Sequence, residues 1–130
     1  MLEGLILEAY PFATIETALN GKLALDKVLE EDLDGKPFEL IFMDINMPEM
    51  DGLESSRLIV QSFNEGRLRS KPYIAAITAY ESPETKRQAL NAGMEKFLTK
   101  PAMAARVYDV CKHVLNNVVH RKLVTSSRSN

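Results

Sequence analysis

Three residues that can handle a phosphoryl group stand at the ends of apolar runs. Asp44 follows the apolar residues 40–43, Thr78 closes the run at 73–78, and Lys100 follows a shorter run. A carboxylate can attack phosphorus to form an acyl phosphate, an ammonium can neutralise the phosphoryl oxygens, and a hydroxyl can donate a hydrogen bond to one of them. Ala79 leaves room for access. Together these residue types indicate phosphoryl transfer, provided that the fold brings them into one crevice.

The elements expected around these residues alternate along the chain. Hydrophobic periodicity and capping signals predict short strands at 15–19, 40–43, 73–78 and 97–98, and helices at 2–9, 23–29, 51–64, 82–92 and 107–118. Such alternation predicts a parallel sheet with helices on both faces. Ligands of such sheets bind beyond the carboxyl ends of the strands, which is where Asp44, Thr78 and Lys100 stand.

The composition is typical of one domain, expected at 1–120, with a flexible polar tail at 121–130. The formal net charge of -2 gives no electrostatic reason to expect binding to nucleic acid or to an anionic membrane. No apolar stretch is long enough to span a bilayer. The single cysteine, Cys111, lies among apolar residues at helical spacing and is expected to be buried. A cytoplasmic setting is therefore expected, either for a free protein or for the soluble part of a membrane-tethered one.

Three segments of the chain resemble the receiver domains of two-component response regulators. LIFMDINMPEMDG at 40–52 is similar to their phosphoacceptor segment, and AAITAY at 75–80 and AGMEKFLTKP at 92–101 are similar to later signatures of the family. The segments occur in the family's order, and the resemblance extends to about His120. It implies a flavodoxin-like, doubly wound α/β fold.

The resemblance also implies roles for individual residues. Asp44 would be the phosphorylated residue, Thr78 the switch hydroxyl, Phe97 the switch aromatic and Lys100 the lysine that contacts the phosphate. The bond between Lys100 and Pro101 would be cis.

Further positions would surround the phosphate. Asn46, Ala79 and Tyr80 would flank it, and a Mg²⁺ ion would be held by the Asp44 carboxylate and the backbone carbonyl of Asn46. The phosphoryl donor would be a sensor histidine kinase or a histidine phosphotransfer protein. The face formed by the fourth helix, the last strand and the final helix would contact partners, a dimer through this face being one option. The short tail fits the C-terminal receiver of a hybrid histidine kinase.

The chain departs from the family at its beginning. Family members start with a central strand that ends in two adjacent acidic residues, which hold the metal ion together with the phosphoacceptor. Here the early acids Glu3 and Glu8 fall on the first expected helix, and neither has an acidic neighbour. With Asp44 as the sole carboxylate, the Mg²⁺ site is expected to be weak or incomplete.

The expected fold therefore lacks its first, central strand, whose two neighbours would lose their hydrogen-bond partner. Three explanations are open. The sequence is a fragment with the strand just upstream, another chain fills the gap, or residues 4–9 form the strand themselves.

Two other functional classes compete with a phosphoacceptor module that is not a classical enzyme. A degenerate receiver, used only as a protein-binding module, would agree with the missing acids. A phosphohydrolase with an aspartyl nucleophile needs a second aspartate two residues after the first, and Asn46 occupies that position. The phosphoacceptor module is the favoured hypothesis, with the binding module as its alternative.

Overall fold

The computed structural model describes residues 2–11, 13–46, 50–79, 82–100, 104–115 and 122–126. Helices and strands alternate in it as the sequence predicts, with one further strand near the C-terminus. The helices are α1 (Leu2–Ala9), α2 (Gly21–Leu33), α3 (Gly52–Asn64), α4 (Pro83–Asn91) and α5 (Ala104–Leu115). The strands are β1 (Thr14–Ala18), β2 (Leu40–Asp44), β3 (Tyr73–Thr78), β4 (Lys96–Thr99) and β5 (Lys122–Ser126).

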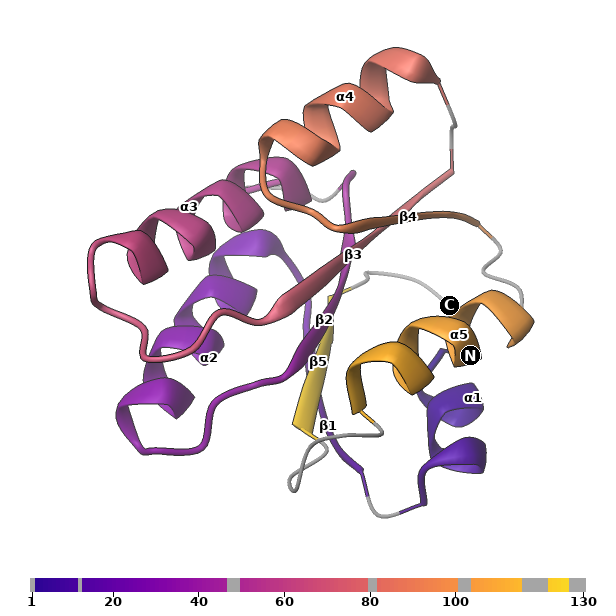
Figure 1. Cartoon of the computed structure of the whole chain (residues 1–130), viewed down its shortest axis with the longest axis horizontal. Coiled ribbons are helices and arrows are strands. Elements are labelled where there is room, and N and C mark those ends of the chain that lie inside the picture. The colour runs from indigo at the N-terminus through magenta and orange to yellow at the C-terminus, as the bar shows by residue number, and fades with distance from the viewer. Residues whose placement is uncertain are drawn as a thin grey trace.

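The strands form one parallel sheet in the order β1-β5-β2-β3-β4. Helices α2, α3 and α4 cover one face and α1 and α5 cover the other (Figure 1). The predicted α/β fold with a parallel sheet is confirmed. Because every strand points the same way, the carboxyl ends of β2, β3 and β4 meet along one edge.

Strand β5 corrects two predictions. The tail at 121–130 was expected to be flexible, and the sheet was expected to lack its central strand, but residues 122–126 form a strand between β1 and β2 (Figure 1). The chain thus fills the gap with its own C-terminal segment. The idea that residues 4–9 supply the missing strand is wrong, because they belong to helix α1.

The side chains of β5 explain why it fits this position. Leu123 joins the apolar cluster under α1 and α5, whereas Val124 joins the cluster under α2, α3 and α4. Both are fully buried, as is usual for a strand covered on both faces. Two adjacent apolar residues thus pack into the helix layers on the two faces of the sheet. The backbone of β5 pairs with β1 and β2, whose facing edges would otherwise lack hydrogen-bond partners.

Helices α2, α3 and α4 begin at residues whose side chains cap them. Asn20, Asp51 and Ser82 each accept a hydrogen bond from the backbone N–H three residues later, at 2.9, 2.9 and 3.1 Å. The caps predicted at Asp51 and Ser82 are therefore confirmed. Within the described part of the chain, no helix is long and apolar enough to cross a membrane.

Candidate functional site

Asp44 is the last residue of β2 and one of the few buried carboxylates of the fold. It is only 1% exposed. Its Oδ1 accepts a hydrogen bond from the backbone N–H of Asn46 at 2.9 Å, and its Oδ2 lies 2.5 Å from Nζ of Lys100. A buried carboxylate needs both hydrogen bonds and a counter-charge, and these two contacts supply them.

The start of α3 lies tightly against the end of β2, and a glycine permits this approach. A Cβ atom at Gly52 would lie 2.2 Å from the backbone oxygen of Asp44. The N–H of Gly52 donates to the backbone oxygen of Ile45 at 3.0 Å. Helix α3 can therefore start directly against the end of β2, and this close approach fixes the backbone that carries the carboxylate.

Lys100 reaches Asp44 from the far side of β3. It follows β4, and its backbone N–H donates to the backbone oxygen of Thr78 at 2.7 Å, which ties the end of β4 to the end of β3. Its side chain is about one-third exposed, so the ammonium spans from solvent to the buried carboxylate. The two residues are 56 positions apart in the sequence, and the sheet order brings them together, as their places at the ends of strands predicted.

Thr78 lies at the same edge. Its predecessor Ile77 is the register partner of Asp44, and Thr78 itself is buried and pairs in register with Thr99. The structure thus brings the ends of β2, β3 and β4 together and places Lys100 on Asp44. Asn46 and Ala79 are exposed beside this edge.

Two of the expected site features lie outside the described residues. These are Tyr80, expected to flank the phosphate, and the bond to Pro101, expected to be cis.

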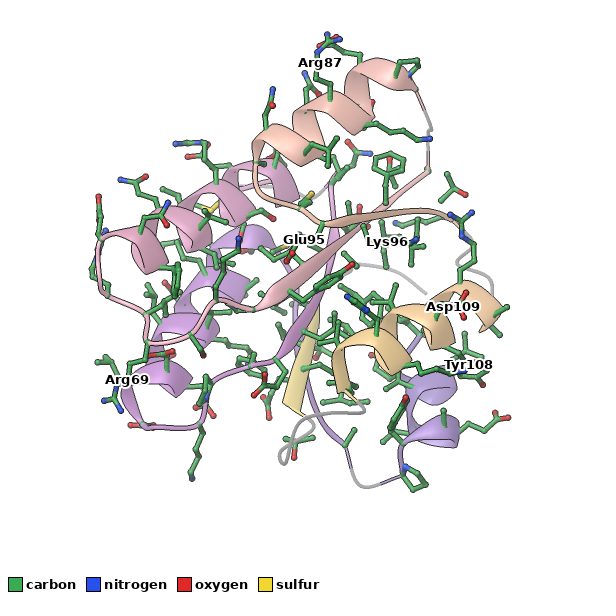
Figure 2. The ribbon with its side chains drawn as sticks, viewed as in Figure 1. Arg69, Arg87, Glu95, Lys96, Tyr108 and Asp109 are labelled. Atoms are coloured by element: carbon green, nitrogen blue, oxygen red, sulfur yellow. The ribbon has the colours of Figure 1, made fainter. Side chains whose placement is uncertain are left out.

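Phe97 lies on β4, half-buried, and packs against the cluster under α2, α3 and α4. Nζ of Lys86 lies 5.7 Å from the centre of its ring. The ring borders an open cavity of about 270 Å³ lined by residues of α4, of the connection to β4, of β4 and of α5, namely Lys86, Ala89, Leu90, Met94, Glu95, Lys96, Phe97 and Arg106. Figure 2 shows Glu95 and Lys96 where the chain enters β4 below α4.

The donors at this edge suit a Mg²⁺ ion poorly. Magnesium in proteins usually takes one or two carboxylates together with phosphate oxygens and water. Among the described residues no group of three or more His, Cys, Asp or Glu could hold a metal ion. Among the described residues that end strands, Asp44 is the carboxylate, and its two oxygens already accept from the backbone N–H of Asn46 and from Nζ of Lys100.

The part of β5 that lies beside the site was not predicted from the sequence. In register, Thr125 pairs with Phe42 and Ser126 with Met43, so β5 ends beside the residue that precedes Asp44. The segment KLVTS holds only two residues of strand-forming type, Val124 and Thr125, and this weak signal becomes informative only once the gap between β1 and β2 is known.

Comparison with known proteins agrees with this geometry. The family model described as "Response regulator receiver domain" matches residues 2–112. The chain is 38% identical over 87 residues to the osmosensing histidine protein kinase SLN1 of Saccharomyces cerevisiae, covering 67% of this chain and 7% of that protein. The chain spans only 11% of the length of the probable histidine kinase 2 of Oryza sativa and 4% of that of the hybrid signal transduction histidine kinase M of Dictyostelium discoideum.

Two solved structures are similar in fold. One is the receiver domain of the histidine kinase CKI1 from Arabidopsis thaliana complexed with Mg²⁺, with 32% identity, a TM-score of 0.61, and coverage of 72% of this chain and 68% of that one. The other is a Saccharomyces cerevisiae co-crystal of the histidine phosphotransfer protein Ypd1 with the receiver domain of the response regulator Ssk1. It shows 26% identity, a TM-score of 0.61, and coverage of 75% and 72%.

Proposed function

Because this chain belongs to the response-regulator receiver family, we propose that Asp44 is its phosphoacceptor in histidine-to-aspartate phosphorelay signalling. The observation that carries the assignment is the contact between Lys100 and a buried carboxylate at a strand end. Such a carboxylate, with an ammonium held against it, is poised for attack on phosphorus because the charge that develops on the phosphoryl oxygens meets a cation already in place. Asp51, the other described acid of this segment, caps α3 instead.

The transfer step balances without further reactants. An oxygen of Asp44 forms a bond to phosphorus while the bond from phosphorus to the donor's histidine nitrogen breaks. The electron pair of that bond stays on the imidazole, which then takes a proton from solvent. Lys100 exchanges its contact with the carboxylate for one with a phosphoryl oxygen, and the hydroxyl of Thr78 donates to another.

The phosphoryl donor is a histidine kinase or a histidine phosphotransfer protein. Support comes from the relatives, which are histidine kinases, and from the structural neighbour that is complexed with a phosphotransfer protein. The catalysis proposed for the chain is limited to its own phosphorylation from small phosphodonors and its own dephosphorylation. The cytoplasmic setting expected from the sequence stays a prediction.

Phosphorylation would act on the α4–β4–α5 face through Thr78 and Phe97. The phosphate adds about -1.5 to -2 charges at Asp44, which draws the Thr78 hydroxyl toward it. The ring of Phe97 then moves inward, away from the cavity that it borders. Coupling of this kind is typically about 1 to 3 kcal/mol, which biases partner binding or dimer formation through this face.

The test is phosphoryl transfer from a phosphorylated histidine phosphotransfer protein, with and without Mg²⁺. The matched variants are Asp44→Asn and Asp51→Asn, which remove neighbouring acids of the same segment, while asparagine at 51 retains a capping side chain. We expect label on the wild-type chain and on Asp51→Asn, and none on Asp44→Asn. Equal label on all three would overturn the assignment, and no label on any would favour a protein-binding module.

A further inference from the structure

The first residue of α2, Gly21, lies directly against the chain that leads into α3. Its backbone N–H donates to the backbone oxygen of Met50 at 2.9 Å. A Cβ atom at Gly21 would lie 2.4 Å from that oxygen and 2.8 Å from the backbone oxygen of Asp51. Gly21 is not one of the glycines with a positive φ, so this position needs glycine for space and not for its backbone conformation.

A buried hydroxyl joins the two helices at the same point. Oγ of Ser55, on α3, donates to the backbone oxygen of Gly21 at 2.8 Å, and both residues are buried. The start of α2 is therefore bound through its N–H to the residue before Asp51 and through its carbonyl to α3 itself. Figure 1 shows the two helices side by side on one face of the sheet.

The same tight packing continues from the start of α3 to the carboxylate. The N–H of Gly52 donates to the backbone oxygen of Ile45 at 3.0 Å, and a Cβ atom at Gly52 would lie 2.2 Å from the backbone oxygen of Asp44. Two glycine contacts therefore stand in series, one between α2 and the start of α3 and one between the start of α3 and the end of β2. Interiors packed this closely transmit displacements, because they hold few voids that could absorb them. A movement at Gly21 is thus passed on to the backbone that carries Asp44.

From these contacts we propose that Gly21 is a positioning residue for Asp44, acting through the start of α3. While this contact holds, the N–H of Asn46 stays on Oδ1 of Asp44. The other oxygen, Oδ2, stays against Lys100, so the carboxylate keeps one orientation for attack on phosphorus. The inference rests on the proposed function in taking Asp44 as the phosphoacceptor, whereas the control of its orientation by Gly21 stands on the contacts alone.

The size of the displacement follows from the distances at Gly21. Ordinary van der Waals contact begins at about 3.4 Å, so a methyl group there requires the backbone oxygen of Met50 to move by about 1 Å. Helix propensity acts in the opposite direction, because alanine is favoured over glycine in a helix. A loss of function in Gly21→Ala would therefore come from the contact. Misplacement of a reacting group by about 1 Å can lower a rate by about 100-fold.

The experiment compares Gly21→Ala with Gly4→Ala, in which the added methyl group meets nothing within 4 Å. Amide hydrogen exchange at Asn46 is measured by nuclear magnetic resonance on the whole, unphosphorylated chain, because the N–H of this exposed residue donates to Asp44. We expect exchange at least about tenfold faster in Gly21→Ala, since a hydrogen bond to a charged group changes an opening equilibrium by that order, and no change in Gly4→Ala. Exchange at the wild-type rate in folded Gly21→Ala would overturn the proposal.

Phosphoryl transfer from a phosphorylated histidine phosphotransfer protein gives the second readout. The rate constant at saturating donor, per folded molecule, should be about 10- to 100-fold lower in Gly21→Ala. The KM for the donor should not change, because Gly21 is buried. A lower thermal midpoint with an unchanged rate constant would mean a purely structural role and would overturn the proposal. If the wild type takes up no phosphate, the Asp44 assignment fails, and the exchange measurement alone decides whether Gly21 orients that carboxylate.

A pair of serine variants tests the same connection without adding an atom, and keeps the test decisive if Gly21→Ala does not fold. Ser55→Ala removes the hydrogen bond from α3 to α2. Ser62→Ala removes a bond of the same length, 2.8 Å, from a buried serine of α3 to Leu58 within that helix. We expect faster exchange at Asn46 in Ser55→Ala and no change in Ser62→Ala. Equal exchange in the two serine variants would contradict the proposal.

Discussion

Replacing Leu123 by alanine tests whether the C-terminal segment forms the middle of the sheet. Leu123 is 0% exposed, pairs in register with Leu40 on one side and Ile15 on the other, and belongs to the cluster under α1 and α5. The substitution removes three carbon atoms, and the burial of each contributes about 0.8 kcal/mol to the free energy of unfolding. It also leaves a cavity between the sheet and the helices α1 and α5. The free energy of unfolding should therefore fall by about 2 to 5 kcal/mol.

The assay is urea denaturation followed by far-ultraviolet circular dichroism, with Leu33→Ala as the matched control. Leu33 is also a leucine but is 73% exposed at the end of α2, so its truncation should change the free energy of unfolding by no more than about 0.5 kcal/mol. A loss of 2 kcal/mol or more is a large part of the 5 to 15 kcal/mol typical of a domain. The reasoning is refuted if Leu123→Ala behaves like Leu33→Ala, because the segment would then be outside the core.

Three further predictions concern the site and its supports. Lys100→Met should lower the free energy of unfolding at pH 7 more than the double variant Lys100→Met/Asp44→Asn does, because the single change leaves a buried carboxylate without its cation; equal losses in denaturant titrations would contradict this. Burial raises the pKa of the Cys111 thiol to about 11, above its ordinary 9.0, so the stability that it contributes should be full below pH 9 and fall as the pH rises toward 11; a Cys111→Ala chain with the same decline between pH 9 and 11 would show another cause. Gly52→Ala should destabilise the fold and shift the Asp44 amide resonance, since its Cβ would meet the Asp44 backbone oxygen at 2.2 Å, whereas Gly4→Ala, in α1 with nothing within 4 Å, should stabilise it by about 0.5 to 1 kcal/mol; similar effects of both would refute the close approach.

The residues that end buried strands were the most predictable part of the site. An apolar run closed by Asp44, and another closed by Thr78, indicate a parallel sheet whose carboxyl edge gathers polar groups, and the structure places both there. The contact between Lys100 and Asp44 followed from the same logic, because the edge is common to all strands. Local signals were equally informative at Asp51 and Ser82, where a capping side chain acts on its own helix.

The position of β5 could not be predicted from local sequence. Leu123 and Val124 sit between Lys122 and Thr125 in a stretch too short to exclude an irregular tail. They form a central strand because β1 and β2 leave room for one between them, and both of these strands lie more than 75 positions earlier in the sequence. The same gap led the sequence analysis to expect an incomplete sheet. The roles of Thr78, Phe97 and Asn46 in switching and phosphate contact stay predictions, since they concern a phosphorylated state.

The most direct test of the central claim is to find the phosphorylated atom. Borohydride reduces an aspartyl phosphate to homoserine, so the reduced peptide carries a mass change at the modified residue. After phosphoryl transfer and borohydride treatment, tandem mass spectrometry should find homoserine at position 44. Homoserine at position 51 instead, or at no position despite incorporated phosphate, would contradict the account.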